Sequence, residues 1–307
     1  MDRRQFIVNA GSLAMTTHLL TKADRTLLAD DVNQEKFPIA IFGKVFQKHS
    51  STQLADVLEQ TDADGVEATI RSGGHVDPEA KDFRPQLAKM VSTLADRGKR
   101  LLIAATDVNE VTPANRELLR ILADNGVKHY RLGYWRYEPG TPMIEQTRVF
   151  AAKAKELAAL NHELGLVGLY QNHAGKDYVG SLIWDLAIVF QDVPVQDLGV
   201  ALDLRHLRAE IGGSYLTAVN AIRLYLRSVY LKDTKRVSED GQELEEVPLG
   251  KGMVNRALFK DVWKSIAPAP ISVHVEYLGQ KPHEPGKDAV VIDAYKNDVA
   301  TLRAWMS

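Results

Sequence analysis

Ionisable side chains gather near the ends of several short apolar runs. In Ser272-Val273-His274-Val275-Glu276, His274 and Glu276 alternate with valines and therefore share one face of an extended strand. Lys232 ends the run that begins at Ser228 in a similar way. A carboxylate base and a cationic hydrogen-bond donor can together remove a proton next to a carbonyl and stabilise the resulting oxyanion. Glu276 is therefore the candidate catalytic base and Lys232 the candidate electrophile, with a simple Lys232–Glu276 ion pair as the structural alternative.

Further polar side chains end the other apolar runs and are candidates for binding a substrate. These are Glu67, Arg71, His75, Arg131, Asn172, His173 and His206. Two of them also have a purely structural interpretation. His75 follows Gly73-Gly74 and could cap a turn, and Arg131 could pair with Glu67.

Short runs typical of strands alternate with longer segments of helical period from Phe37 onward. The eight expected strands begin near Pro38, Val66, Arg100, Val127, Leu166, Gly199, Ser228 and Ile271. Between them, stripes such as Leu87, Met90, Val91 and Leu94 have the spacing of a buried helix face. Strand-then-helix units in series predict a parallel sheet, because parallel neighbours need a crossover connection. We therefore expect one α/β domain over residues 37–307, a (β/α)8 TIM barrel with its chemistry at the carboxyl ends of the strands.

An open, doubly wound sheet is the competing architecture. It usually carries a glycine-rich phosphate turn after its first strand, whereas that turn reads Phe42-Gly43-Lys44-Val45-Phe46 here. Glycines stand just before four of the expected strands, where a left-handed residue would end each helix; they are Gly65, Gly98, Gly126 and Gly165. The segment from Thr234 to Gly252 is expected to form a surface turn and then a loop over the barrel mouth.

Residues 1–36 differ from the rest of the chain. Arg3-Arg4 precedes a mildly apolar stretch from Ile7 to Met15, which resembles a twin-arginine export signal. This signal predicts a periplasmic or secreted protein. A merely disordered start, in a cytoplasmic protein, is the alternative.

Composition narrows the classes of function and partner. A net charge of -2 and scattered basic residues argue against nucleic acid as a partner. No apolar stretch reaches the length of about 18 residues that a membrane-spanning helix needs. The chain has no cysteine, so Asp, Glu, His and Lys must carry any chemistry.

Taken together, these segments resemble the xylose isomerase-like barrels of the sugar phosphate isomerase/epimerase family. The resemblance rests on Asn172-His173, Asp203-x-x-His206, Lys232-Asp233, the loop Pro248-Leu249-Gly250-Lys251-Gly252, and His274-Val275-Glu276. It implies a divalent metal, manganese, magnesium or zinc, held by groups on strands five to eight. The corresponding candidate ligands are Gln171, Asp203, His274 and Glu276. Gln171 stands where a Glu is common and Tyr230 where the ligand His is expected, so we predict a weak or vacant metal site with Lys232 supplying the positive charge.

The resemblance implies a sugar or keto-sugar isomerase or epimerase acting on a small carbohydrate. A lyase that cleaves 3-keto glycosides would use nearly the same residues. A barrel that binds carbohydrate without catalysis is a third hypothesis, in which aromatic residues near the rim stack on sugar rings; they are Tyr134, Trp135, Tyr137, Tyr170 and Tyr178. The sequence leaves the oligomeric state open, with a homo-oligomer among the alternatives.

Overall fold

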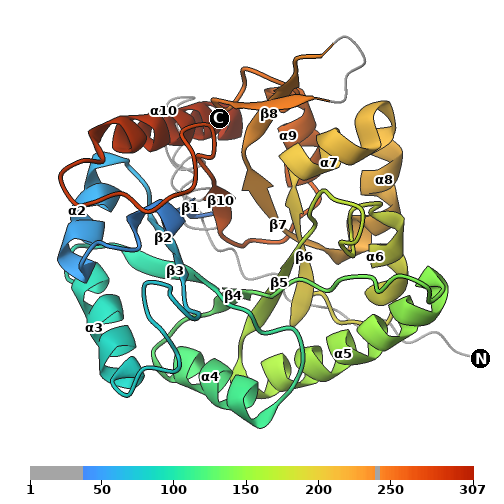
Figure 1. Cartoon of the computed structure of the whole chain (residues 1–307), viewed down its shortest axis with the longest axis horizontal. Coiled ribbons are helices and arrows are strands. Elements are labelled where there is room, and N and C mark those ends of the chain that lie inside the picture. Colours follow the sequence, from blue (N-terminus) through green and yellow to red (C-terminus); the bar gives the residue numbers. More distant parts are fainter. Residues whose placement is uncertain (1–36, 239–242) are drawn as a thin grey trace, which may run out of the picture.

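Short apolar segments form a closed barrel of parallel strands in the computed structural model, which describes residues 37–238 and 243–307 (Figure 1). Around the barrel the strands follow the order β1-β10-β7-β6-β5-β4-β3-β2. Their bounds are β1 (Ile39–Phe42), β2 (Gly65–Thr69), β3 (Arg100–Ala105), β4 (His129–Arg131), β5 (Val167–Gln171), β6 (Leu198–Asp203), β7 (Leu226–Leu231) and β10 (Ile271–Val273). The predicted TIM barrel is therefore confirmed, while the predicted export signal lies outside the described residues.

Alternation along the strands separates two apolar layers. On β1, Ile39 and Ile41 belong to the large core between strands and helices, whereas Ala40 belongs to a small cluster with Leu169 and Tyr230. Successive strand side chains point to opposite faces, so this smaller cluster fills the interior of the barrel. Polar side chains that face inward nearer the carboxyl ends of the strands therefore pack on this apolar cluster.

Helices surround the barrel and cover its outer face (Figure 1). Their bounds are α2 (Ser51–Gln60), α3 (Phe83–Ala95), α4 (Pro113–Asp124), α5 (Met143–Leu164), α6 (Trp184–Val189), α7 (Leu204–Ile211), α8 (Tyr215–Ile222), α9 (Arg256–Trp263) and α10 (Ala289–Met306). The stripe Leu87, Met90 and Leu94 is buried on α3 as predicted. Helix starts are marked by side chains that accept backbone N–H groups, including Thr112 before α4 and Asn255 before α9. In the described part of the chain, no helix is long and apolar enough to cross a membrane.

Three of the four glycines predicted to be left-handed have that conformation. Gly98, Gly126 and Gly165 have φ of 66°, 77° and 68°. The prediction is wrong for Gly65, which is the first residue of β2; the left-handed residue before this strand is Asp62, with φ of 56°. Gly65 is needed for a different reason. A Cβ there would lie 2.2 Å from the carbonyl oxygen of Arg100 on the neighbouring strand.

A Gly65→Ala substitution should therefore destabilise the protein strongly. We expect a loss of about 3 kcal/mol or more, at the upper end of the range for overpacked cores, because the clash is with backbone. Gly98→Ala is the matched control, since nothing lies within 4 Å of a Cβ there and only the left-handed backbone is penalised, by about 1–2 kcal/mol. Urea unfolding measures both, and equal losses would contradict this explanation of Gly65.

The segment after β7 forms a hairpin rather than the predicted turn and loop. Strands β8 (Asp233–Arg236) and β9 (Leu244–Val247) pair antiparallel, and residues 239–242 between them lie outside the described part. Asp233 fixes the hairpin to the following loop, because its carboxylate accepts the N–H groups of Gly250, Gly252 and Val254 at 2.7–3.0 Å. The prediction failed because the spacing of apolar residues along the sequence does not reveal this strand pairing or these backbone contacts.

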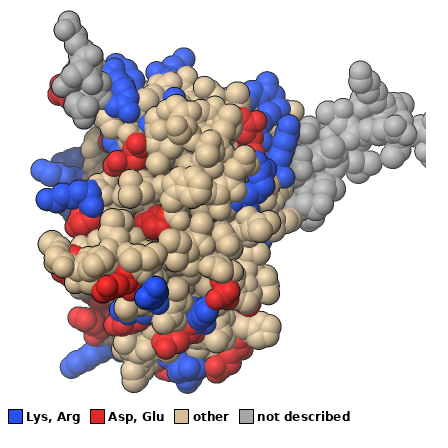
Figure 2. All heavy atoms as spheres, turned by 90° about the vertical axis from the view of Figure 1, so that its right-hand side faces the viewer, with Lys and Arg blue, Asp and Glu red and all other residues tan. Residues whose placement is uncertain are grey.

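The side of the barrel with α6 and α8 faces the viewer in Figure 2. Its central area is uncharged and is bordered by charged side chains. Leu182 and Trp184 at the start of α6, Ile188 within it and Leu216 on α8 are exposed apolar residues. The homo-oligomer considered from the sequence stays a prediction, with this surface as its candidate interface.

Candidate functional site

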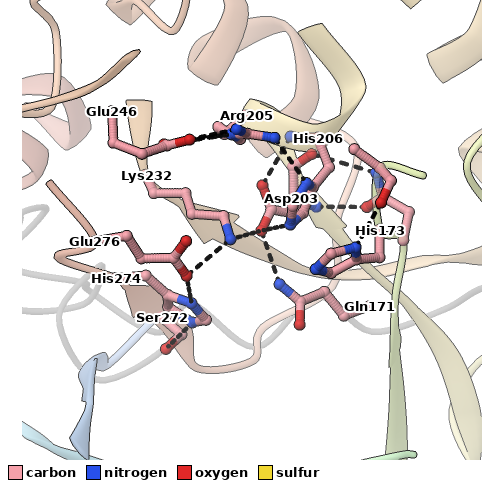
Figure 3. Close-up of polar contacts among 12 residues, drawn as sticks. Gln171, His173, Asp203, Arg205, His206, Lys232, Glu246, Ser272, His274 and Glu276 are labelled. Atoms are coloured by element: carbon pink, nitrogen blue, oxygen red, sulfur yellow. Dashed lines mark hydrogen bonds and ion pairs between the residues drawn. The ribbon is translucent and has the colours of Figure 1, made fainter. Parts of the chain in front are cut away.

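Seven polar side chains form a closed series of contacts at the carboxyl ends of the strands. We call this series the ring; part of it is drawn in Figure 3. In order its members are Glu67, Arg131, Gln171, Asp203, Lys232, Glu276 and His274, and the last contacts the first again. The ring includes both predicted catalytic residues and all four predicted metal ligands.

Lys232 lies between Asp203 and Glu276 in the ring. Its Nζ donates to Glu276 Oε1 at 2.9 Å and lies 3.5 Å from Asp203 Oδ2. The Lys232 side chain is 5% exposed and that of Glu276 15%. The predicted catalytic pair is thus brought together, and the ion pair considered as its structural alternative is also formed.

These contacts explain the pKa values on this side of the ring. Burial alone would lower the pKa of Lys232, but the carboxylates of Asp203 and Glu276 raise it. Burial alone would raise the pKa of Glu276, but Lys232 and His274 hold it well below its usual range. Glu276 is therefore a weak base while it is paired. A ligand oxygen that accepts the Lys232 hydrogen bond would weaken the pair and make Glu276 more basic.

Glu67 lies deeper and is fully buried. Its Oε2 accepts from Ser272 Oγ and lies 3.0 Å from His274 Nε2, while its Oε1 lies 3.1 Å from Arg131 Nε. Burial would raise the pKa of Glu67, yet Arg131 and His274 lower it. For His274 burial would lower the pKa, yet Glu67 and Glu276 raise it. The alternative that Arg131 pairs with Glu67 is therefore confirmed, and both residues form the floor of the site.

Gln171 joins the two halves of the ring. Its Oε1 accepts from Arg131 Nη1 at 2.6 Å and from the Tyr134 hydroxyl at 2.8 Å. Its Nε2 donates to Asp203 Oδ2 at 2.7 Å. Because both acceptor sites of the oxygen are used by donors, the amide must turn its N–H group toward Asp203.

Three of the predicted substrate-binding residues lie beside Asp203. Asn172 exchanges hydrogen bonds with the Asp203 backbone, accepting its N–H at 2.7 Å. His206 donates its backbone N–H to Asp203 Oδ1 at 3.0 Å, and the centroid of its imidazole lies 4.0 Å from that of the His173 imidazole. Burial, and next Lys232, put the pKa of His206 well below its usual value; burial also lowers that of His173. The site therefore has neutral imidazoles on one side and the Lys232–Glu276 pair on the other.

The other two predicted residues make no polar contact with the ring in the described residues. Arg71 lies at the rim, 3.6 Å from Asp107. His75 Nδ1 lies 2.8 Å from Thr69 Oγ1, and burial lowers the pKa of this histidine to about 4. The imidazole of His75 packs against Gly43, because a Cβ added to Gly43 would lie only 3.0 Å from His75 Cε1. This favours the structural interpretation of His75 as part of the turn after β2.

Aromatic residues proposed for sugar stacking separate into two groups. Trp135, Tyr137 and Tyr170 are buried in the core. Tyr134 and Tyr178 are half-buried at the mouth, with ring centroids 5.2 Å apart, and both pack against the ring of His173. Only this second pair is placed to contact a ligand.

Two contacts of the site were missed in the sequence. The Ser272 hydroxyl supports Glu67, and its position two residues before His274 on one strand face was the available signal. Arg205 Nε lies 3.0 Å from Glu246 Oε1, which connects α7 to the β8–β9 hairpin above Lys232 (Figure 3). No sequence pattern indicated that pair, because it depends on the hairpin.

The residues of the ring do not fit a divalent metal. In residues 37–238 and 243–307 no group of three or more Asp, Glu or His side chains is arranged to hold one. Gln171 presents an N–H group to Asp203, and the Lys232 ammonium lies between the oxygens of Asp203 and Glu276, where a cation would need to bind. His274 turns its Nε2 to Glu67. The predicted ligand set of Gln171, Asp203, His274 and Glu276 is therefore held together by hydrogen bonds and ion pairs instead.

Comparisons with known proteins agree on the architecture. The sequence pattern described as xylose isomerase-like TIM barrel matches residues 47–293. No curated protein sequence matches the chain. A xylose isomerase-like TIM barrel protein from Mycobacterium smegmatis in complex with magnesium is 15% identical, with a TM-score of 0.64 over 90% of this chain and 99% of that one.

Two epimerases are similar to the same extent. The 3-keto-D-glucoside 4-epimerase from E. coli is 14% identical, with a TM-score of 0.62 over 87% of this chain and 99% of that one. D-psicose 3-epimerase with D-tagatose, from Clostridium cellulolyticum H10, is 11% identical, with a TM-score of 0.62 over 88% and 99%. At such identities the likeness concerns the fold.

Proposed function

Since this chain belongs to the xylose isomerase-like TIM barrel family, we propose that it isomerises or epimerises a carbohydrate by removing a proton next to a carbonyl. The observation that carries the proposal is the Lys232–Glu276 pair, 2.9 Å apart at the carboxyl ends of the strands. Enzymes with this fold place their chemistry at that end of the barrel. The names of two structural neighbours, a 3-keto-D-glucoside 4-epimerase and a D-psicose 3-epimerase, support a keto sugar as substrate.

The chemistry follows from the geometry of the pair. A substrate carbonyl oxygen accepts a hydrogen bond from Lys232, which loosens the hold of the ammonium on Glu276. Glu276 then takes the proton from the adjacent carbon, and the electrons of the C–H bond move onto the carbonyl oxygen. Lys232 stabilises the resulting enediolate. To isomerise the sugar, Glu276 returns the proton to the neighbouring carbon while the hydroxyl proton of that carbon passes to the first oxygen. To epimerise it, a proton must reach the original carbon from the opposite face.

Lys232 supplies the positive charge for this reaction in our proposal. The ammonium lies among the oxygens of Asp203 and Glu276, and Gln171 adds no negative charge to attract a hard cation. A metal is accordingly weakly bound or absent during turnover. The magnesium complex of the Mycobacterium smegmatis neighbour is the contrasting case within the same fold.

Elimination from a 3-keto glycoside is the second candidate, and Gln171 favours it. Epimerisation by two carboxylates needs a second carboxylate across the ring from Glu276, but the ring carries Gln171 there, and its amide neither takes up nor releases a proton. Elimination needs one base and a proton donor for the leaving group. A lyase would use Glu276 as the base, and the proton that Glu276 takes from carbon would pass to the departing glycosidic oxygen, because the neutral imidazoles of His173 and His206 are poor proton donors.

Hydrogen exchange with solvent tests the proposal directly. In D₂O, deuterium should enter the substrate carbon of a ketose or 3-keto glucoside, and Glu276→Gln should slow this exchange by about 10²–10⁴-fold, the usual contribution of a general base. Mass spectrometry or proton NMR of the recovered sugar measures it. Glu163→Gln, on an exposed residue of α5 paired with Arg116, is the matched control and should exchange normally.

The products separate the candidate functions. Release of an aglycone from a 3-keto glycoside identifies the lyase, whereas a product that keeps its aglycone identifies the epimerase. Sugar binding without any exchange across a broad panel would contradict both, and would leave the non-catalytic carbohydrate-binding barrel.

A further inference from the structure

The end of the barrel opposite the ring contains a cavity of about 600 Å³. It lies at the amino ends of the strands, between Pro38 before β1, the start of β3 and β4, and the segment 268–270 before β10. Among the described residues that line it, the ionisable ones are all basic; they are Lys99, Arg100, Lys128 and His129. No Asp or Glu is among these lining residues, so their charges are not balanced within the cavity wall.

Arg227 is not one of the lining residues, but its positive charge acts on His129, which is. The β6–β7 register pairs Val200 with Leu226 and Ala201 with Ser228, which leaves Arg227 as an extra residue on β7. Its Cβ lies beside Gly199, where an added Cβ would meet it at 2.7 Å. The buried Nε of Arg227 has no hydrogen-bond partner in the described structure. A guanidinium N–H in this position is costly unless an acceptor binds there.

The electrostatics agree with this unbalanced charge. Burial lowers the pKa of Arg227. Burial, followed by the charges of Arg227 and Lys128, lowers the pKa of His129 to about 4. Lys99 uses one donor on the carbonyl of Ala63 at 2.8 Å, and an ammonium group has three. An anion in the cavity would offset the charges of Lys99, Arg100 and Lys128 and accept hydrogen bonds from the remaining donors of Lys99.

We propose that this cavity binds the phosphate group of a small phosphate monoester. Arginine and lysine are the side chains that recognise phosphate, the first through paired N–H donors and the second as a point charge. The volume exceeds what a single phosphate ion occupies, so an organic group of sugar size can accompany it. This site lies at the other end of the barrel from the ring, and the proposal does not depend on the proposed reaction.

Calorimetric titration of the full chain with inorganic phosphate and with glucose 6-phosphate tests the proposal. We expect glucose 6-phosphate to bind, and Arg227→Met, which removes the charge that acts on His129, to weaken binding at least about tenfold. Lys128→Gln should weaken it in the same direction; this residue is exposed, so the variant should fold normally even if Arg227→Met does not. Lys296→Gln, on an exposed lysine of α10, is the charge-matched control and should bind as the unaltered protein does.

Comparing the two ligands shows which part of the ligand is recognised, and comparing the variants shows whether it binds in the cavity or at the ring. Equal affinity for both ligands means that the cavity recognises phosphate alone, and tighter binding of glucose 6-phosphate means that it also contacts the organic part. No heat at about 10 mM of either ligand would overturn the proposal. So would binding that is lost in Lys232→Met but unchanged in Arg227→Met and Lys128→Gln, because the ligand would then bind at the ring.

Discussion

Lys232→Met should reduce turnover by at least about 10²–10³-fold, the usual cost of removing one group that stabilises a developing oxyanion. The variant removes the ammonium that contacts both Glu276 and Asp203 and replaces it with an apolar side chain of similar length. EDTA should leave the activity of the unaltered protein nearly unchanged. Both results follow if the lysine supplies the charge that a metal would otherwise provide.

Two controls make this prediction specific. Lys235→Met removes a half-buried lysine of β8 that pairs with Glu245, only three residues from Lys232 along the chain, and should leave turnover unchanged. Elemental analysis of protein purified without chelators measures bound metal. A stoichiometric metal that is lost in Asp203→Ala, together with activity that EDTA removes, would contradict the prediction and assign the cationic role to a metal.

Most of the barrel could be predicted from the sequence because its signals are local. The apolar run Leu101 to Ala105 has the length of a strand buried on both faces, and the stripe Leu118 to Leu122 has the period of the helix that it forms. Glycines at 98, 126 and 165 mark helix ends for a reason that lies within a few residues. Gly65 shows the limit of this reasoning, since the contact that requires glycine is with Arg100 on another strand.

The members of the site could be predicted from the fold, but their contacts could not. A barrel places Asp203, Lys232 and Glu276 at one end, so their proximity followed from knowing where strands end. Hydrogen-bond direction was beyond sequence reasoning. Whether Gln171 offers oxygen or nitrogen to Asp203 depends on Arg131 and Tyr134, which belong to other segments.

Arg131→Met should destabilise the protein by about 3–5 kcal/mol, the usual cost of removing one partner from a buried ion pair. It leaves Glu67 fully buried without its guanidinium partner. Arg116→Met is the matched control: its pair with Glu163 is exposed, and such pairs contribute only about 0–1 kcal/mol.

The double variant Arg131→Met with Glu67→Leu separates the stability lost with the ion pair from the stability lost with side-chain packing. Replacing both charges by apolar groups of similar size is often close to neutral, so the double variant should recover much of the lost stability in urea unfolding. Equal losses in Arg131→Met and Arg116→Met would show that Glu67 is held adequately by Ser272 and His274 alone. If instead the double variant is stable but inactive, the charges of Glu67 and Arg131 serve to orient Gln171 and His274, and through them the ring positions the Lys232–Glu276 pair.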